Sequence, residues 1–358
     1  MLAVVDDYRT TSTALLRDPN DVAALVDMFA LLADNGQPQD VAAHMVLAKR
    51  AFALSPEHPR VIFNYATALS RLGGHNDAIL LYLKCLPIDQ RSEWRALVLY
   101  HIALGFRSMG EWEKALDYYA QSLALDPQSQ VRVDQALTVM GAGRLNEGLR
   151  LFEARKELAE IRDRQLGEAS STLSRLPPGV VHWNGEDLRS KSITVYQEEG
   201  VGDFFMFCRF LPQLQAAKIF LTGRSKDLLE FVSDHIPVEG ILPLEGPFNT
   251  DYVTGSMSVP WRTRVEWSDI IGEPYFHVEP AMIPRRGRLN VGLCWRGSPG
   301  YKRDHLRSMP FREFVPLFDM TNAAFYSLQI GPATKEDTRG ADYLYRSCPH
   351  PGDGHLDS

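Results

Sequence analysis

The sequence is poor in cysteine, and its cysteines do not form pairs. Four thiols occur in 358 residues, at positions 85, 208, 294 and 348. No two are close enough for the CxxC spacing of a zinc ribbon or a redox motif. The histidines also lack metal-ligand spacing, so neither a metal site nor a bound cofactor is predicted. Isolated thiols suit a reducing compartment, and a cytoplasmic protein is expected.

Long apolar runs and concentrated charge of one sign are missing too. No apolar run approaches the roughly 20 residues that span a bilayer. The first residues, MLAVVDDYRTTS, lack the basic start of a signal peptide. The 45 acidic residues outnumber the 38 basic ones and give a net charge of -7. Without a basic stripe, the chain is a poor candidate for a general nucleic-acid binder.

The remaining composition is that of an ordinary globular protein. Apolar residues make up 45% of the chain and charged residues 23%, which excludes wholesale disorder and fibrous repeats. A chain of 358 residues is long enough for two or three domains. A soluble protein of several domains without a membrane span is therefore expected.

Glycines recur at nearly regular intervals in the first part of the chain. Gly36, Gly73, Gly110 and Gly143 are separated by 37, 37 and 33 residues. Glycine permits the turn between two antiparallel helices. Five positions after each of the last three glycines comes a small residue, which lets the two helices approach closely. Four positions further on, an aromatic residue fills the gap to the next unit. These sets are Gly73–Ala78–Tyr82, Gly110–Ala115–Tyr119 and Gly143–Gly148–Phe152.

This pattern resembles the tetratricopeptide repeat, whose period is about 34 residues. The resemblance covers residues 20–155 and predicts an α-solenoid domain over residues 1–158. Such solenoids stack into a superhelix whose concave face usually binds a peptide. Phe63, Arg71, Tyr100 and Arg107 should lie on the first helices of their units and are candidates to line a peptide-binding groove. The alternative is that they are ordinary packing or solvated residues.

The segment after the repeats changes character. It is first charged, then rich in serine and threonine, and it ends in LPPG at residues 176–179. A fraying helix followed by a linker is predicted over residues 159–180.

Strand and helix patterns alternate over residues 181–286. Strands are expected at 193–197 and 218–223, with short strands in GILPL and DYVTG. Helices are expected at 204–215, which is apolar all round and should be well buried, and at 227–236. Such alternation predicts a parallel sheet with helices on both faces. Ligands bind beyond the carboxyl ends of the strands of such sheets, where the loop EEGVGD at 198–203 lies.

A second strand pattern begins in residues 287–358. Strands are expected at 290–295 and 323–331, a helix at 309–320, and one further short strand at 343–345. A long polar and basic loop spans residues 296–308. Two convincing strands are too few for a free-standing parallel domain, so the chain is expected to stop inside this domain.

Two loops hold residues that could carry chemistry. Gly200 and Gly202 allow a ligand to approach the backbone, and the helix that follows favours anions. The loop lacks the third glycine of the dinucleotide fingerprint. Asp203 is either the N-cap of this helix or a general base.

In the second loop, Lys302, Arg307 and Ser308 suit the binding of a diphosphate or a similar anion. The alternative is that this loop is a solvated surface loop.

Five segments occur in a particular order along the chain. They are WNGEDL at 183–188, EEGVGDFFMFCRFLP at 198–212, MSVP at 257–260, VGLCWRGSPGYKRDHLRSMP at 291–310 and FYSLQIGP at 325–332. In this order they resemble bacterial tetratricopeptide-repeat proteins fused to a heptosyltransferase-like glycosyltransferase of the GT-B type. The resemblance implies an α plus α/β fold, with a repeat solenoid followed by two Rossmann-like halves of which the second is incomplete.

The resemblance also implies an activity. The first half, residues 181–286, would take the acceptor, and the second half, residues 287–358, the nucleotide-sugar donor. Asp203 would act as the base, while Lys302 and Arg307 would neutralise the departing diphosphate. The repeats would hold a protein or glycan acceptor or a partner, and no metal is required.

Departures from the family pattern support a second hypothesis of another class. Glu199, Phe204 and Ile330 stand where the family usually has glutamine, threonine and lysine. The later donor-binding segment of the second half is absent from the sequence. The alternative is a non-catalytic scaffold for protein interactions, with a degenerate or truncated glycosyltransferase region.

Overall fold

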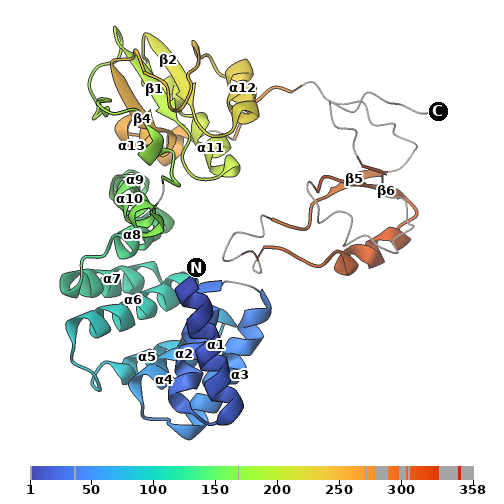
Figure 1. Ribbon diagram of the computed structural model, residues 1–358. Coiled ribbons are helices and arrows are strands. Elements are labelled where there is room, and N and C mark those ends of the chain that lie inside the picture. The colour runs from blue at the N-terminus through green and yellow to red at the C-terminus, as the bar shows by residue number, and fades with distance from the viewer. Residues whose placement is uncertain are drawn as a thin grey trace. The chain divides into compact units, whose positions relative to one another are not determined.

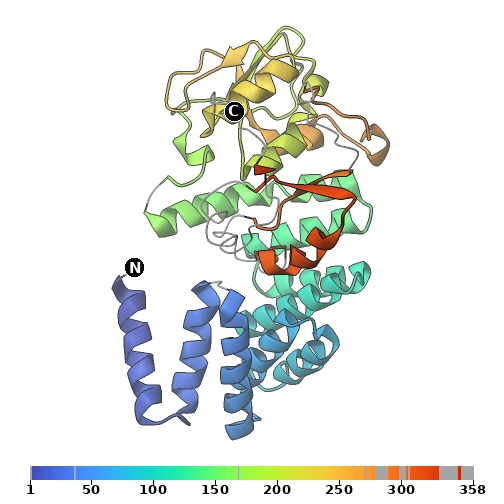
Figure 2. The ribbon, with the colours of Figure 1, turned by 90° about the vertical axis from the view of Figure 1, so that its right-hand side faces the viewer.

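The computed structural model describes residues 2–35, 38–167, 169–270, 272–278, 289–297, 304, 307–329 and 346–347. The chain divides into two compact units. One unit consists of residues 1–72 together with residues 279–358, and the other of residues 73–278. Figures 1 and 2 show the ribbon from two directions.

Helices follow one another along residues 2–71. They are α1 (Leu2–Arg17), α2 (Val22–Asn35), α3 (Pro38–Leu54) and α4 (Pro59–Arg71). Each helix packs against the next, as the blue ribbons in Figure 2 show. Their interior holds small clusters of buried residues, among them Leu25, Phe29, Ala51 and Val61. Gly36, the first predicted turn glycine, lies outside the described residues.

The helical pattern continues in the second unit. The helices are α5 (His75–Cys85), α6 (Ser92–Ser108), α7 (Trp112–Leu125), α8 (Ser129–Gly141), α9 (Leu145–Leu151) and α10 (Ala154–Leu166). Gly110 and Gly143 form the turns of two hairpins with φ angles of +77° and +88°. Only glycine adopts this left-handed conformation without strain. Ala115 and Tyr119 are fully buried. The glycine spacing therefore identified helical hairpins.

Residues 159–180, predicted as a fraying helix and a linker, include the second half of α10. This helix ends at Leu166. The chain then forms the short 3-10 helix η1 (Leu173–Arg175). The Asp163 carboxylate anchors this turn, because it accepts hydrogen bonds from the hydroxyls of Ser170, Ser171 and Ser174. The serine-rich stretch is thus held to the end of α10.

A small parallel sheet follows, as the alternating pattern predicts. Its strands are β1 (Ser192–Tyr196), β2 (Lys218–Thr222), β3 (Gly240–Ile241) and β4 (Tyr252–Gly255), in the order β3-β2-β1-β4. In the register, Val195 of β1 lies opposite Leu221 of β2 and Thr254 of β4. The neighbouring helices are α11 (Val201–Cys208), α12 (Lys226–His235) and α13 (Val259–Arg262). Short 3-10 turns complete this part, namely η2 (Leu211–Leu214), η3 (Ser256–Ser258) and η4 (Trp267–Asp269).

The first helix after β1 differs from its prediction. The expected helix at 204–215 begins earlier, at Val201, and ends at Cys208. Phe204 and Cys208 are fully buried, but Val201 and Met206 are each 50% exposed. An apolar composition all round the helix therefore did not produce burial all round, because the sheet covers one side only.

The sheet and the last helices of the repeat share one hydrophobic core. Leu145 and Leu149 of α9 belong to the same buried cluster as Phe204, Leu211 and Val259. The α9 helix also packs against α13. The Trp267 Nε1–H donates to the Gly143 carbonyl oxygen at 2.7 Å. The helical and α/β parts of residues 73–278 are therefore joined by continuous packing.

A second parallel sheet lies in residues 289–347. Its strands are β5 (Leu289–Leu293), β6 (Ala323–Ser327) and β7 (Arg346–Ser347), in that order. The predicted strand at 343–345 falls outside the described residues. The predicted α-helix at 309–320 is instead a 3-10 helix, η6 (Phe311–Asp319). Pro316 inside it has no N–H to donate, which weakens an α-helical ladder.

Candidate functional site

The loop between β1 and α11 lies at the carboxyl edge of the first sheet. The Gly200 N–H donates to the Asp203 Oδ2 at 3.1 Å, so the third residue of α11 satisfies the backbone of the N-cap residue. The prediction that Asp203 is the N-cap is wrong: Gly200 holds that position, and the Asp203 carboxylate accepts the N–H of this N-cap residue from the first turn of α11. The role of general base requires a substrate and remains a prediction. Gly202 has open space around its Cα, so its backbone is accessible.

Buried Gln197 joins this loop to the loop that follows β2. Its Oε1 accepts hydrogen bonds from the backbone N–H groups of Arg224 at 3.1 Å and Ser225 at 3.3 Å. Gly223 is packed so closely on Gln197 that an added Cβ would lie 2.6 Å from the glutamine Cβ. Two loops at the carboxyl edge are thus held to each other.

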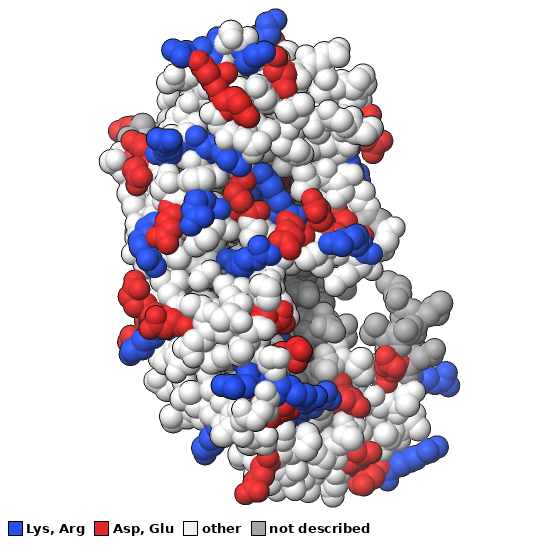
Figure 3. Space-filling view, turned by 90° about the vertical axis from the view of Figure 1, so that its left-hand side faces the viewer, with Lys and Arg blue, Asp and Glu red and all other residues white. Residues whose placement is uncertain are grey.

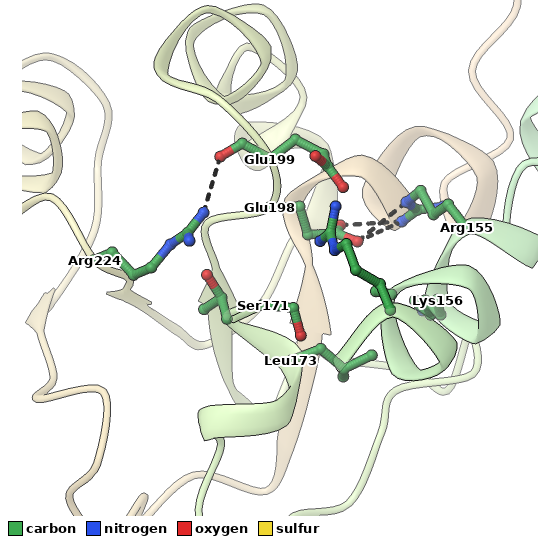
Figure 4. A pocket seen from close by; sticks show the side chains of 10 residues that line it. Arg155, Lys156, Ser171, Leu173, Glu198, Glu199 and Arg224 are labelled. Carbon is green, nitrogen blue, oxygen red and sulfur yellow. Dashed lines mark hydrogen bonds and ion pairs between the residues drawn. The ribbon is translucent and has the colours of Figure 1, made fainter. Parts of the chain in front are cut away.

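A buried ionic cluster connects α10 to the same edge. Arg155 of α10 is 6% exposed and donates to both carboxylate oxygens of Glu198, at 3.1 and 3.0 Å. It also donates to Glu153 and to Ser258, each at 2.8 Å. Glu198 accepts a further hydrogen bond from the Met257 N–H at 2.9 Å. Figure 4 shows Arg155 and Glu198 facing each other across the pocket wall.

The charges in this cluster stabilise one another. Burial alone would raise the pKa of Glu153, but Arg155 and Lys156 outweigh burial and lower it to about 2. The Lys156 Nζ lies 2.9 Å from a Glu153 oxygen. Burial opposes the charged form of Arg155, yet Glu198 and Glu153 raise the pKa of its guanidinium above the usual value. Glu153 and Arg155 are therefore both ionised at neutral pH.

A pocket opens beside this cluster, between α10, the η1 turn and the loops after β1 and β2. It contains about 380 Å³ of empty space, part of which is open to solvent. Figure 4 shows the labelled side chains arranged around it. The lining residues are Arg155, Lys156, Ala159, Arg162, Ser171, Thr172, Leu173, Glu198, Glu199 and Arg224. Glu199 has a φ angle of +50°, which is unusual for a residue other than glycine.

The predicted groove residues of the second unit, Tyr100 and Arg107, lie together on α6. The Tyr100 hydroxyl donates to the Asp134 Oδ2 at 2.8 Å, and the Arg107 Nη1 lies 2.7 Å from the Asp134 Oδ1. Gln130 donates to the same carboxylate at 2.9 Å. Burial, followed by the charge of Asp134, raises the pKa of Tyr100, which therefore stays protonated. Asp134 thus links α6 to α8.

The other two predicted groove residues, Phe63 and Arg71, lie on α4 in the unit that contains residues 1–72. Phe63 is half-buried. The Arg71 Nη1 is 3.3 Å from the Nε2 of His44, a side chain that is almost fully buried.

The basic loop of residues 296–308 is described only in part. The Arg307 Nε donates to the Asp304 Oδ1 at 3.0 Å. The Ser308 Oγ accepts the Gly297 N–H at 2.9 Å. Lys302 lies outside the described residues, so the predicted donor-binding set is not seen together.

No metal site or membrane span was found in the part of the chain that the structure describes. Its histidine, cysteine, aspartate and glutamate side chains form no group of three that could hold a metal ion. None of its helices is long and apolar enough to cross a membrane. In Figure 3, basic and acidic side chains are interspersed over the face drawn, without a continuous basic area.

The helices of residues 75–151 have the form of a helical-repeat protein, and part of them matches a known repeat. Residues 96–129, which span most of α6, the turn after it and all of α7, match the family model of the tetratricopeptide repeat. This match identifies a tetratricopeptide repeat in the chain. It contains Tyr100 and Arg107.

Similar proteins were also found over longer stretches. Protein FlbA of Caulobacter vibrioides is 22% identical over 206 residues, which cover 56% of this chain and 32% of FlbA. Photosystem I assembly protein Ycf3 of Acaryochloris marina is 38% identical over 55 residues, or 15% of this chain and 33% of Ycf3. The chain thus spans about a third of the length of each of these relatives.

Solved structures resemble the chain only in part. TTC0263, a thermophilic TPR protein of Thermus thermophilus, is 22% identical in sequence. The matched region covers 45% of this chain and 87% of the TTC0263 chain. The TM-score of this comparison is 0.37.

Sequence reasoning missed the pocket. Its residues come from α10, from the segment predicted to be a linker, and from two different loops of the sheet. Arg155 is one of many charges in a charged helix, so no local pattern marked it. The paired carboxylates Glu198 and Glu199 directly after a buried strand were the one local signal, because strand ends in parallel sheets commonly face ligands.

Proposed function

We propose that this chain is a protein-binding module that uses the first helices of its tetratricopeptide-type hairpins to hold a peptide segment of a partner. The observation that carries the proposal is the network of Tyr100, Arg107 and Asp134 within and beside the matched repeat. One relative, Ycf3, is named as an assembly protein, which agrees with a role in holding partners.

The proposed binding surface is one face of α6. Leu97, Tyr100, Leu104 and Arg107 are spaced by three, four and three residues and therefore lie on the same side of the helix. Leu97 is 40% exposed, and Leu104 and Tyr100 are partly buried. This α6 face offers apolar area beside a cation, which suits an extended peptide.

Asp134 orders the polar part of the α6 face in advance. It accepts hydrogen bonds from both Tyr100 and Arg107, so neither side chain has to be immobilised when a partner binds. Its contact with Arg107 uses one of the five N–H donors of the guanidinium. The other donors can bind backbone carbonyls or a carboxylate of the peptide.

Site-specific photo-crosslinking tests the proposal. A photoreactive amino acid replaces Leu97 on the α6 face, or exposed Asp117 on α7 as the matched control. In cells that produce the full chain, we expect a discrete crosslinked protein from position 97 and none from position 117. The additional change Asp134→Ala should abolish this adduct. Equal crosslinking from both positions, or none from position 97, would overturn the proposal.

Glycosyl transfer is a second candidate, supported by one observation. The loop with Gly200, Gly202 and Asp203 opens a helix at the carboxyl edge of a parallel sheet, where ligands bind in open α/β folds. In this candidate, residues 181–286 and 287–358 belong to two Rossmann-like halves of a GT-B enzyme. Asp203 is the base, and Lys302, Arg307 and Ser308 bind the diphosphate of a nucleotide-sugar.

Titration with uridine and adenosine diphosphates separates this candidate from the scaffold. Saturable binding of either nucleotide that is weakened by Arg307→Gln supports glycosyl transfer. The variant Asp203→Asn should then bind normally and lose transfer to a protein or glycan acceptor. If neither diphosphate binds at about 1 mM, this chain acts without a donor site and the scaffold function stands.

A further inference from the structure

Two buried hydroxyls at the carboxyl edge of the first sheet, and one beside the η1 turn, lack a hydrogen-bond partner among the described residues. They belong to Thr172, Tyr196 and Ser256. Tyr196 is the last residue of β1, and Ser256 directly follows β4, so both lie at the carboxyl edge. Thr172 is 3% exposed and lines the pocket beside Arg155. Unpaired buried hydroxyls are uncommon, and Thr172, the one of the three residues that lines the pocket, points to a polar group that binds there.

The pocket also has positive charge that is not neutralised. Glu198 and Glu153 bind Arg155, and Glu153 also binds Lys156, so these four charges balance. Arg224 donates to two backbone carbonyls, of Ser170 at 2.9 Å and of Glu199 at 3.4 Å, which do not neutralise it. Figure 4 shows Arg224 reaching toward the Glu199 carbonyl.

Arg162 adds a second cation to Arg224. It is an exposed residue of α10 that lines the same pocket. The one lining carboxylate outside the balanced cluster is Glu199. Two guanidinium groups therefore face a single carboxylate, and an anion with bidentate oxygens would complete the site.

The walls of the pocket are fixed before any ligand arrives. Arg155 fastens α10 to the loop after β1, Gln197 fastens this loop to Arg224, and Asp163 fastens the turn that contains Ser171. Glu199 is held at a φ angle of +50°, a strained conformation of the kind that clusters at ligand sites. Fixed walls lower the entropy cost of binding a small molecule.

From these observations we infer that the pocket binds a small hydroxylated organic phosphate. The guanidinium groups of Arg162 and Arg224 bind the phosphate oxygens. The Thr172 hydroxyl and the Glu199 carboxylate bind hydroxyl groups of the same molecule. This site is separate from the α6 face, and its existence does not depend on partner binding there.

Titration of the full chain with glycerol 3-phosphate tests the inference, with amide NMR signals as the readout. At low ionic strength, saturable shifts are expected at Ser171, Thr172 and Glu199. Inorganic phosphate should bind more weakly because it lacks the hydroxyl groups, and glycerol alone should not bind. If glycerol 3-phosphate gives no saturable shift up to about 10 mM, or if phosphate binds equally well, the inference is wrong.

Two variants with one matched control sharpen this test. Arg162→Gln should weaken binding about tenfold, the value of one charge-assisted hydrogen bond, whereas Arg164→Gln on the exposed side of the same helix should have no effect. Thr172→Val should weaken binding while leaving the melting temperature unchanged or higher, since an unpaired buried hydroxyl is removed. Equal effects of Arg162→Gln and Arg164→Gln, or an unchanged affinity in Thr172→Val, would contradict the assignment.

Discussion

Arg155 uses all of the hydrogen-bonding capacity of its side chain inside the protein. A guanidinium has five N–H donors, and Arg155 makes five hydrogen bonds, to Glu198 twice and to Glu153, Ser258 and the Phe152 carbonyl. No donor is left for a ligand. Although it lines the pocket, Arg155 is therefore a structural residue, and Arg162 and Arg224 remain for binding.

Replacement of Arg155 by methionine should destabilise the protein strongly. The change leaves the carboxylates of Glu198 and Glu153 buried without their cation, and breaking a buried ion pair in this way costs about 3–5 kcal/mol. Urea unfolding measures the loss. Arg164→Met, an exposed change on the same helix, should alter the free energy of unfolding by less than about 0.5 kcal/mol. Equal stabilities of the two variants would show that the cluster contributes little.

Glu153 should make the stability depend on pH in the acid range. Its pKa falls from 4.5 to about 2 on folding, because Arg155 and Lys156 outweigh burial. The unfolded state therefore binds the proton more tightly, so this contribution is complete above pH 4.5 and is lost as the pH falls toward about 2.

Urea unfolding at a series of pH values checks this behaviour. Glu153→Gln should flatten the dependence between about pH 5 and pH 2, whereas Glu160→Gln on the exposed side of α10 should retain it. If the free energy of unfolding changes with pH in the same way in both variants, the acid sensitivity comes from other carboxylates.

Single residues were the hardest level to predict from the sequence. Asp203 was expected as the N-cap or a base because a local motif surrounds it, but the structure places it at the third helical position, behind the N-cap Gly200. Arg155, Thr172 and Arg224 meet only after folding, over separations of up to 69 residues in the sequence. No local pattern can show such a meeting. The network on Asp134 was missed too, although Tyr100 and Asp134 are separated by 34 residues, one repeat period.

The hairpins show how element packing follows from one small residue. Gly148 of α9 lies so close to α8 that an added Cβ would be 2.3 Å from the Met140 Cγ and 2.9 Å from the Ala136 carbonyl oxygen. The corresponding positions in the preceding hairpins are Ala78 and Ala115, which are buried without such a clash. The α8–α9 pair is therefore packed more closely than its neighbours can be.

Gly148→Ala should separate α9 from α8 and cost about 1–3 kcal/mol through overpacking. The better helix propensity of alanine offsets about 1 kcal/mol at most. Gly105→Ala is the control, because its new Cβ would meet no backbone but only the Ile79 side chain, 2.9 Å from Cγ1 and 3.0 Å from Cδ1, which can change its rotamer. Thermal unfolding compares the two variants. A smaller cost at Gly148 than at Gly105 would contradict this packing argument.

Periodicity predicted the elements well and their exact form less well. Turn glycines and strand-helix alternation gave the helical hairpins and the parallel sheet because both signals are local. The helix at 309–320 became a 3-10 helix around Pro316, a residue that a pattern of apolar positions alone does not weigh. The half-exposed Met206 could not be foreseen, since burial of α11 depends on what packs against it.

At the scale of residues 73–278, helical and α/β parts have one core. Leu149 of α9 packs within the cluster that also holds Phe204 and Val259. Leu149→Ala should cost about 2–5 kcal/mol. Hydrogen exchange should then show protection falling together in α9, α13 and β1. Leu116→Ala, in the separate core of α6 and α7, should leave β1 protected. Loss of protection confined to α9 would indicate independent folding of the two parts.

The attachment of α10 to the sheet has a consequence for how such a protein can diversify. Arg155 and the α9 leucines tie the terminal hairpin of the array to one particular strand edge, so this hairpin cannot be exchanged for that of another array. The hairpin formed by α6 and α7 has no such tie to the sheet among the described contacts. Recombination, in nature or by design, can therefore duplicate or replace units ahead of α8 while the pocket is inherited intact.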